Sequence, residues 1–279
     1  MALPDSVLAH LRRVAAEPDL TGTPYTLEGL LGRGGLGAVY AVQDHQLERR
    51  VALKVLHAAS DQAARALAEA RHIAQLEHPG IPPIHEAGIL ADGRAYYTMR
   101  LVDGEPLQPS AAGSLSDRLR LFQKIADAVA YAHAQGVVHR DLKPANILVG
   151  PFGEVFVMDW ATQDVRGTPS WSAPESSRTP AADIYSLGQL LAALLPQDAP
   201  RALNAVAQHA AHPDPASRYP NVPALEEEIR RFLDGERVLA HQETLLERTV
   251  RLYRRHEVLW LLLAAYVAVR FFLFFWSRT

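Results

Sequence analysis

The stretch HRDLKPAN at residues 139–146 decides which fold the sequence predicts. It follows a predicted helix over Ser116–Gln135 and precedes an apolar run, Ile147–Val149. A second apolar run ends in Asp159, 13 residues beyond Asn146. A lone aspartate in a loop usually forms a turn. Two aspartates, an amide and a lysine with this spacing are not plausibly a chance combination, so we interpret them as one site.

The side chains of this site match the needs of phosphoryl transfer. That reaction requires oxygen ligands for Mg²⁺, a carboxylate that accepts the proton of the attacking hydroxyl, and a cation beside the transferring phosphate. Asn146 and Asp159 suit the metal, Asp141 suits the proton, and Lys143 suits the phosphate.

A glycine-rich segment upstream, LGRGGLGAV at residues 31–39, contains the pattern G-x-G-x-x-G-x-V. Glycines alone are weak evidence because they also mark ordinary turns. A dinucleotide-binding fold requires a helix directly afterwards, whereas residues 39–42 have the pattern of a strand. We therefore expect a hairpin that closes over phosphates.

Lys54 lies within an apolar strand predicted over Val51–Leu56. A lysine in such a strand is costly unless its charge is paired; a side chain that reaches outward to solvent is the alternative. The chain has only 3 lysines among its 28 basic residues, so each lysine is expected to have a specific role.

The composition narrows the class of protein. A chain of 279 residues with 48% hydrophobic residues can bury a core, which excludes global disorder. The absence of cysteine excludes disulfides, thiolate metal sites and a cysteine nucleophile. A net charge of −3 gives no electrostatic reason to expect a nucleic-acid partner.

The chain divides into a strand-rich half and a helical half. Strands are expected around Val39, over Val51–Leu56 and over Tyr96–Val102, with one helix between them, Ala63–Glu77. The second half has predicted helices at Ser116–Gln135, Ala182–Leu195, Arg201–His212 and Val222–Leu233. This order predicts two lobes with a cleft between them.

Residues 258–276 form a separate run of 19 residues with one charge, Arg270. A helix over this run is about 28 Å long, which is enough to span the hydrocarbon core of a bilayer. Basic residues cluster before the run, so the positive-inside rule places residues 1–257 in the cytoplasm. A hydrophobic helix docked on the domain or on a partner is the alternative.

With these motifs together, residues 25–235 resemble a bacterial serine/threonine protein kinase of the eukaryotic-like type. The resemblance implies an α+β, two-lobed protein-kinase-like fold, with a β-rich N-lobe and a helical C-lobe, to which a single transmembrane helix is added. It implies ATP and Mg²⁺, or Mn²⁺, as cofactors. It also implies that Asp141 and Lys143 are catalytic and that Asn146 and Asp159 bind the metal.

The resemblance assigns a nucleotide site as well. Lys54 is expected to grip the α- and β-phosphates and to pair with Glu69, and Met99 is expected to be the gatekeeper before the hinge at residues 100–102. The expected nucleotide-binding residues are Leu31, Gly32, Gly34, Gly35, Gly37, Val39, Ala52, Lys54, Glu69, Met99 and Leu148.

Residues 167–175 resemble the end of an activation segment, with Thr168 beside the catalytic residues. Glu175 is expected to pair with Arg218, and Asp183 to cap the back of the catalytic loop. The contact of Thr168 with Asp141 and Lys143 is typical of a kinase that phosphorylates serine and threonine in proteins.

The chain departs from the family pattern in several places. The metal-binding triplet at residues 159–161 is Asp-Trp-Ala, where the family has Asp-Phe-Gly. Only seven residues separate Asp159 from Gly167, and Asp183 lies only 35 positions before Arg218. These shortened segments bear on substrate recruitment rather than on the phosphoryl chemistry.

The predicted organisation has five parts. They are a lead helix in residues 1–24, a kinase domain in 25–235 (N-lobe 25–102, C-lobe 103–235), a juxtamembrane segment in 236–257, a transmembrane helix in 258–276 and a tail in 277–279. The expected location is the inner cell membrane, crossed once, with the kinase domain in the cytoplasm. The expected partners are proteins with serine or threonine and the lipid bilayer through residues 258–276, with no nucleic acid.

The expected function is transfer of the γ-phosphoryl group of ATP to protein hydroxyls at the cytoplasmic membrane face. A membrane-anchored pseudokinase that acts as a nucleotide-gated scaffold is the alternative, and a small-molecule phosphotransferase is a third. Activity is favoured because Lys54, Asp141, Asn146 and Asp159 are all present.

Overall fold

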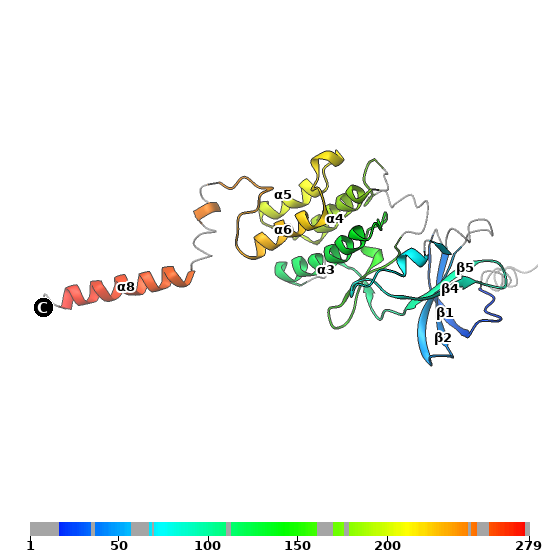
Figure 1. Cartoon of the computed structure of the whole chain (residues 1–279). Helices are drawn as coiled ribbons and strands as arrows, with labels where there is room; N and C mark the ends of the chain where they lie inside the picture. Colours follow the sequence, from blue (N-terminus) through cyan, green and yellow to red (C-terminus); the bar gives the residue numbers. More distant parts are fainter. Residues whose placement is uncertain are drawn as a thin grey trace, which may run out of the picture.

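The computed structural model describes residues 17–34, 37–56, 67–68, 70–109, 113–160, 170–175, 179–244, 247–249 and 257–276. Figure 1 shows a strand-rich lobe beside a helical lobe, from which one further helix extends. The predicted division into two lobes is confirmed.

The N-lobe is a five-stranded antiparallel sheet with the strand order β1-β2-β3-β5-β4. Its strands are β1 (Tyr25–Gly34), β2 (Gly37–Asp44), β3 (Arg49–Leu56), β4 (Ile84–Ile89) and β5 (Ala95–Arg100). The strands predicted around Val39, over Val51–Leu56 and from Tyr96 onward are confirmed, although β5 ends at Arg100 rather than Val102.

The central strand β3 separates two apolar clusters, because successive side chains of a strand point to opposite faces of the sheet. Val51 and Leu53 pack into a cluster on one face. Ala52 and Leu56 belong to a second cluster on the other face. Lys54 lies between Ala52 and Leu56 in the alternation and therefore points to the same side as they do.

The strands β1 and β2 form the predicted hairpin, in which Gly34 pairs with Gly37. Gly37 is required for the close packing of β2 on β3, because a Cβ atom there would lie 2.1 Å from the carbonyl oxygen of Val55. The sequence does not predict the full length of β1, because its glycines and exposed leucines obscure the alternation of a strand.

The C-lobe is built on α3 (Leu115–Ala134), α4 (Pro180–Leu194), α5 (Arg201–Ala210) and α6 (Val222–Leu233). All four predicted helices are confirmed to within two residues at each end. The core forms where the apolar face of α3, with Phe122, Ile125 and Val129, packs against Leu187 and Leu190 of α4.

A small second sheet adjoins residues 139–146, the segment that holds most of the residues predicted for the chemistry. Its strands are β6 (Glu105–Pro106), β7 (Ile147–Val149) and β8 (Val155–Val157), and a 3₁₀ turn, η2 (Pro144–Asn146), leads into β7. The β7–β8 turn is fixed by Lys124 of α3, whose Nζ donates to the carbonyl of Gly153 at 2.6 Å. This bond gives the third lysine a specific role.

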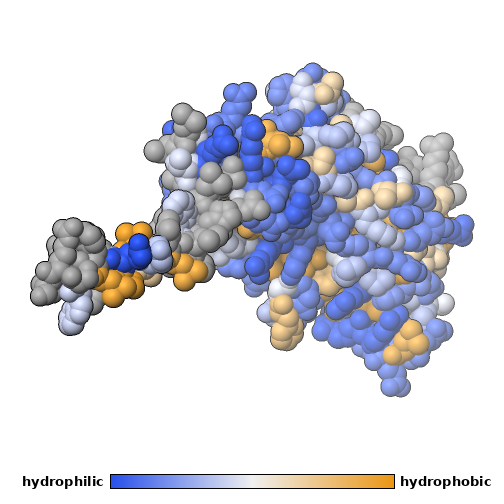
Figure 2. Space-filling model, turned by 60° about the vertical axis from the view of Figure 1, so that its left-hand side comes forward, coloured by the Kyte–Doolittle hydropathy of each residue, from blue (hydrophilic) through white to orange (hydrophobic). Residues whose placement is uncertain are grey.

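The last helix, α8 (Glu257–Trp276), extends away from the C-lobe in Figure 1. Figure 2 shows hydrophobic side chains along this protruding helix, whereas hydrophilic residues cover much of the visible face of the lobes. Within the described part of the chain, no helix is both long and apolar enough to cross a membrane. The transmembrane helix predicted over residues 258–276 is therefore not confirmed.

Two other predicted helices fall wholly or partly outside the described residues. The lead helix predicted within residues 1–24, at Val7–Ala16, lies outside them. Of the helix predicted over Ala63–Glu77, residues 67–68 and 70–73 are described and are helical, and the helix ends at residue 73, before a turn.

Candidate active site

Lys54 reaches across from β3 of the N-lobe to Asp159, which follows β8. The Nζ atom of Lys54 lies 2.9 Å from Oδ1 of Asp159, and the lysine side chain is 4% exposed. Burial alone would lower the pKa of Lys54, but the neighbouring Tyr97 and Asp159 outweigh it and keep this pKa raised. Lys54 is therefore a paired charge and does not reach outward to solvent.

Asp159 has an unusual backbone conformation and a carboxyl group with a lowered pKa. Its φ of 56° lies in the left-handed region, which is costly for a residue with a side chain and is common at functional sites. Burial would raise the pKa of its carboxyl group, but the Lys54 ammonium prevails and holds this pKa below the usual range. The side chain of Asp159 is consequently an ionised carboxylate, partly exposed, whose oxygens can coordinate a metal ion.

Within residues 139–146, three polar side chains form a compact cluster around Asp141. The Nζ atom of Lys143 lies 2.6 Å from Oδ2 of Asp141. Asn146 donates through Nδ2 to the backbone carbonyl of Asp141 at 2.8 Å and to its Oδ2 at 3.1 Å. The turn η2 makes these contacts, because it folds Asn146 back onto the two preceding polar residues. The structure thus brings together three of the four residues predicted for chemistry and metal binding.

The back of the catalytic loop is held by Asp183 of α4, which is 1% exposed. Its Oδ2 accepts from the backbone N–H of His139 at 2.7 Å, and its Oδ1 accepts from that of Arg140 at 2.8 Å. His133 of α3 lies 2.8 Å from the same Oδ2. The predicted capping role of Asp183 is confirmed, and the left-handed φ of 72° at Arg140 is one of the conformations that this cap stabilises.

His139 joins the catalytic loop to the segment that carries Asp159. Its Nε2 lies 2.8 Å from the carbonyl of Met158, which can only accept, and its Nδ1 accepts from the backbone N–H of Asp141 at 3.3 Å. These bonds require the tautomer protonated on Nε2. Burial lowers the pKa of His139, so the ring is neutral at physiological pH. The backbone of Asp141 and that of Met158, the residue before Asp159, are therefore linked through one buried imidazole.

Trp160 occupies the place where the family pattern has phenylalanine. Its ring is 4% exposed and lies 4.7 Å, centroid to centroid, from the ring of His139. Its Nε1–H donates to the carbonyl of Val157 at 2.9 Å. The indole therefore fills the core and satisfies its own donor, as expected for a buried tryptophan.

Three of the apolar residues expected at the nucleotide site, Val39, Ala52 and Met99, lie in one cluster on the cleft side of the N-lobe sheet, and Leu31 and Leu148 do not belong to it. Ala52 of β3 pairs with Met99 of β5 in the sheet register. Val39 of β2 and Met158 pack against the same cluster. Three strands and the segment after β8 therefore contribute to one apolar surface next to Lys54.

The β1 arm of the glycine-rich hairpin is open on one face. Leu31 is 54% exposed. Among the described residues, no atom lies within 4 Å of the positions where Gly32 and Gly34 would carry a Cβ. Leu148 on β7 is half-buried. An open glycine face beside a partly exposed leucine is what a loop that covers phosphates requires.

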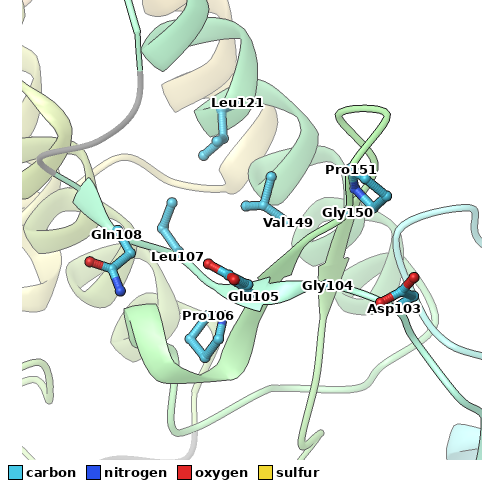
Figure 3. A pocket seen from close by; sticks show the side chains of 10 residues that line it. All are labelled: Asp103, Gly104, Glu105, Pro106, Leu107, Gln108, Leu121, Val149, Gly150 and Pro151. Carbon is cyan, nitrogen blue, oxygen red and sulfur yellow. The ribbon is translucent and has the colours of Figure 1, made fainter.

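A pocket of about 520 Å³ lies beside the hinge, between residues 103–108 and the β7–β8 turn (Figure 3). Its walls include Leu107, Leu121 and Val149, with the carboxylates of Asp103 and Glu105 nearby. Neither the catalytic nor the metal-binding residues predicted from the sequence line this pocket, so the phosphoryl chemistry belongs elsewhere.

Glu175 and Arg218 form the predicted ion pair. The two Arg218 Nη atoms lie 2.7 and 2.8 Å from the two carboxylate oxygens of Glu175. The buried guanidinium also donates to the backbone carbonyls of His212, Ala181 and Pro213. The hydrogen bonds from Arg218 hold the pKa of Glu175 below its usual range.

Some predicted residues lie outside the described part of the chain. They are Gly35 of the glycine-rich loop, Glu69 as the partner of Lys54, and Thr168 of the activation segment. Conversely, the sequence reasoning missed His133 and Tyr97, which contact Asp183 and Lys54. His133 carries no local signal, because it lies inside an ordinary amphipathic helix.

The donor set fits a magnesium ion that is shared with a nucleotide. The described residues contain no group of three or more histidine or carboxylate side chains that could hold a metal alone. Mg²⁺ commonly takes one or two carboxylates and completes its shell with substrate phosphates and water. Asp159 offers a carboxylate, and Asn146 offers its amide oxygen because its Nδ2 donates to Asp141.

Fold and site together define the class of protein kinases. Residues 25–239 match the family model described as protein kinase domain, so the chain belongs to this family. The serine/threonine-protein kinase PknA of Mycobacterium tuberculosis is 37% identical over 242 residues, which cover 75% of this chain and 55% of the relative. The serine/threonine-protein kinase PknD of Chlamydia trachomatis is 30% identical over 298 residues, covering 76% of this chain and 32% of the relative. The chain thus spans about half the length, or less, of these curated relatives.

Proposed function

We propose that this chain is an active serine/threonine protein kinase that transfers the γ-phosphoryl group of ATP to hydroxyl groups of proteins. The observation that carries the proposal is the contact between Lys54 and Asp159, 2.9 Å long, which joins the N-lobe to the segment beside the Asp141 cluster. The names of the relatives support the choice of serine and threonine.

Each side chain has a part in the proposed reaction. Lys54 binds the α- and β-phosphates and orients them. The substrate hydroxyl oxygen forms a bond to the γ-phosphorus, and the bond from that phosphorus to the β-phosphate oxygen breaks, so ADP leaves with the electron pair. Asp141 accepts the hydroxyl proton, and Lys143 neutralises charge on the transferring group. Mg²⁺, held by Asp159 and Asn146, would supply charge neutralisation on the phosphates.

A pseudokinase that binds nucleotide without transferring phosphate is the competing function. Such a protein commonly loses one of the charged groups of the site. Here the Lys54–Asp159 pair and the Asp141–Lys143 pair both have hydrogen-bonding geometry, which supports an intact catalytic apparatus.

The decisive experiment compares Asp141→Asn and Lys54→Met in the full chain, with labelled ATP, Mg²⁺ and mapping of the phosphorylated residues. Asp141→Asn should retain ATP affinity and lose turnover by at least about 10²-fold, the low end for a positioned base. Lys54→Met should weaken ATP binding as well, because the phosphates lose their cation.

The matched control is Asp198→Asn, which makes the same chemical change at an exposed loop position. It should transfer phosphate at the wild-type rate. An Asp141→Asn variant as fast as wild type would contradict the proposed function, and a wild-type chain that binds ATP without transfer would favour the scaffold.

We further propose that residues 258–276 anchor the chain to a membrane with the kinase domain on the cytoplasmic face. The support is the run of 19 residues with one charge, Arg270, and the arginines that precede it. The described side chains Leu262, Val267 and Leu273 are more than half exposed, so their apolar surface is left uncovered by the rest of the described chain. Extraction from membranes tests this proposal.

A further inference from the structure

Tyr97 on β5 is the direct cross-strand neighbour of Lys54. The antiparallel register of β3 and β5 pairs the two residues. Directly paired side chains of adjacent strands lie on the same face of a sheet. Both residues are 4% exposed, so Tyr97 shares the buried, cleft-facing side of the N-lobe with the lysine.

Two contacts join the tyrosine to the ammonium group. The Nζ atom of Lys54 lies 5.9 Å from the centre of the Tyr97 ring. The second contact is electrostatic, because Tyr97 helps to keep the pKa of Lys54 raised. The distance to the ring is at the outer limit of a cation–π contact, so the electrostatic contact is the stronger of the two. The ammonium therefore donates a hydrogen bond to Asp159 and has Tyr97 as its cross-strand neighbour.

The neighbouring Tyr96 provides an internal comparison. It is 5% exposed but points to the opposite face of the sheet, where it packs with Tyr25. Its hydroxyl donates to Oε1 of Glu86 at 3.0 Å. Consecutive residues of one strand thus place two buried phenols in different surroundings, and only Tyr97 lies on the cleft side.

We propose that Tyr97 is a positioning residue for Lys54, a role that rests on the proposed kinase function. The lysine side chain has four rotatable carbons and a compact ammonium that accepts partners in many directions. Two fixed side chains on different elements, Tyr97 on β5 and Asp159 after β8, flank the ammonium and restrict it to one place. Tyr97 thereby holds the charge where the α- and β-phosphates of the nucleotide bind.

The test measures binding of ADP and of adenosine, in the presence of Mg²⁺, to the full chain and to two variants. Tyr97→Phe removes the hydroxyl and keeps the ring, and Tyr96→Phe makes the same change at a position of equal burial on the other face. Tyr97→Phe should weaken ADP binding about tenfold, as expected for the loss of one polar neighbour of a buried charge. It should leave adenosine binding unchanged, because adenosine has no phosphate for Lys54 to hold.

The control variant and the remaining outcomes distinguish a role of Tyr97 in positioning Lys54 from a role in packing the pocket. Tyr96→Phe should bind both ligands like wild type, and thermal unfolding should show that both variants are folded. Equal ADP affinity in Tyr97→Phe and wild type would overturn the positioning role of Tyr97 and would leave the proposed kinase function standing. An equal loss for adenosine would also overturn the positioning role, because it would indicate a general change of the pocket. A wild-type chain that binds neither ligand would contradict the proposed kinase function and with it this role.

Discussion

Arg218 uses every donor of its guanidinium. Its Nε donates to one backbone carbonyl, and each Nη atom donates to one oxygen of Glu175 and to one further backbone carbonyl. Its side chain is fully buried, and a buried charge is tolerated only when it is paired and hydrogen-bonded. Glu175 supplies the only compensating negative charge among these acceptors.

Replacing Glu175 by glutamine should therefore destabilise the fold by about 3 kcal/mol, because a buried arginine is left without its counter-charge. Glu227→Gln is the control, since it breaks an ion pair with Arg230 that lies in water and should change the unfolding temperature little. Thermal or denaturant unfolding of both variants measures the difference. Equal unfolding midpoints for Glu175→Gln and wild type would contradict the importance of the pair.

For single residues, the sequence predicted those that form motifs and did not predict those that are brought to the site only by strand pairing. Asp141, Lys143 and Asn146 lie close in the chain, so their spacing alone indicates a site. Tyr97 is 43 residues from Lys54 and becomes its neighbour only through the register of β3 and β5. Such a contact cannot be found from local spacing.

The packing of α6 against α3 places a carboxyl group in an unfavourable position. Glu226 of α6 is half-buried and lies near Asp127 of α3. Burial, together with the charge of Asp127, raises the pKa of Glu226 to about 7. Asp127 itself lies 3.2 Å from Nε2 of His78. The folded state therefore binds a proton at Glu226 that the unfolded chain releases at lower pH.

Because the folded-state pKa of Glu226 is raised, its contribution to stability is complete below about pH 4.5 and is lost as the pH rises through about 7. Glu226→Gln should therefore have a higher unfolding temperature than wild type at pH 8 and nearly the same one at pH 5. Thermal unfolding at both pH values measures this. The adjacent Glu227→Gln should show no such difference between pH 5 and pH 8, since the pKa of Glu227 is lowered to about 2.

Elements with a strong local pattern were predicted well, and those defined by their partners were not. The bounds of α6 agree with the prediction because apolar residues recur along one face of this helix. The structure adds a cap at its start, where the side chain of Asn221 accepts from the backbone N–H of Ala224. The strand β4 has an irregular, largely exposed pattern and is ordered by pairing with β5. Its sequence alone does not distinguish it from a loop.

At the scale of the whole molecule, α8 stands apart from the two lobes (Figure 1). The proposed anchor predicts that a single charge in its middle releases the chain from membranes. Val267→Arg adds a cost of about 2.5–3.5 kcal/mol near the centre of a spanning helix, whereas Val267→Leu adds none. The wild type and Val267→Leu should resist carbonate extraction, and Val267→Arg should be extracted more readily.

Deletion of residues 258–276 provides the second arm of this experiment. The shortened chain should be extracted completely and should unfold at the same temperature as wild type, because no other described element packs extensively on α8. Carbonate extraction of the wild type would contradict the anchor and favour a helix that binds another protein.

The buried carboxylate of Asp183 has a consequence for hydrogen exchange. His139 and Arg140 lie outside any helix or strand, yet their amide hydrogens are bonded to Asp183 in the core of the C-lobe. These hydrogens can exchange with deuterium only when α4 separates from the loop, which requires the lobe to open as a unit. Both amides should therefore exchange as slowly as those of α3, while exposed turns such as Ala91–Asp92 exchange quickly. On the scale of minutes to hours, the catalytic loop should behave as part of the core.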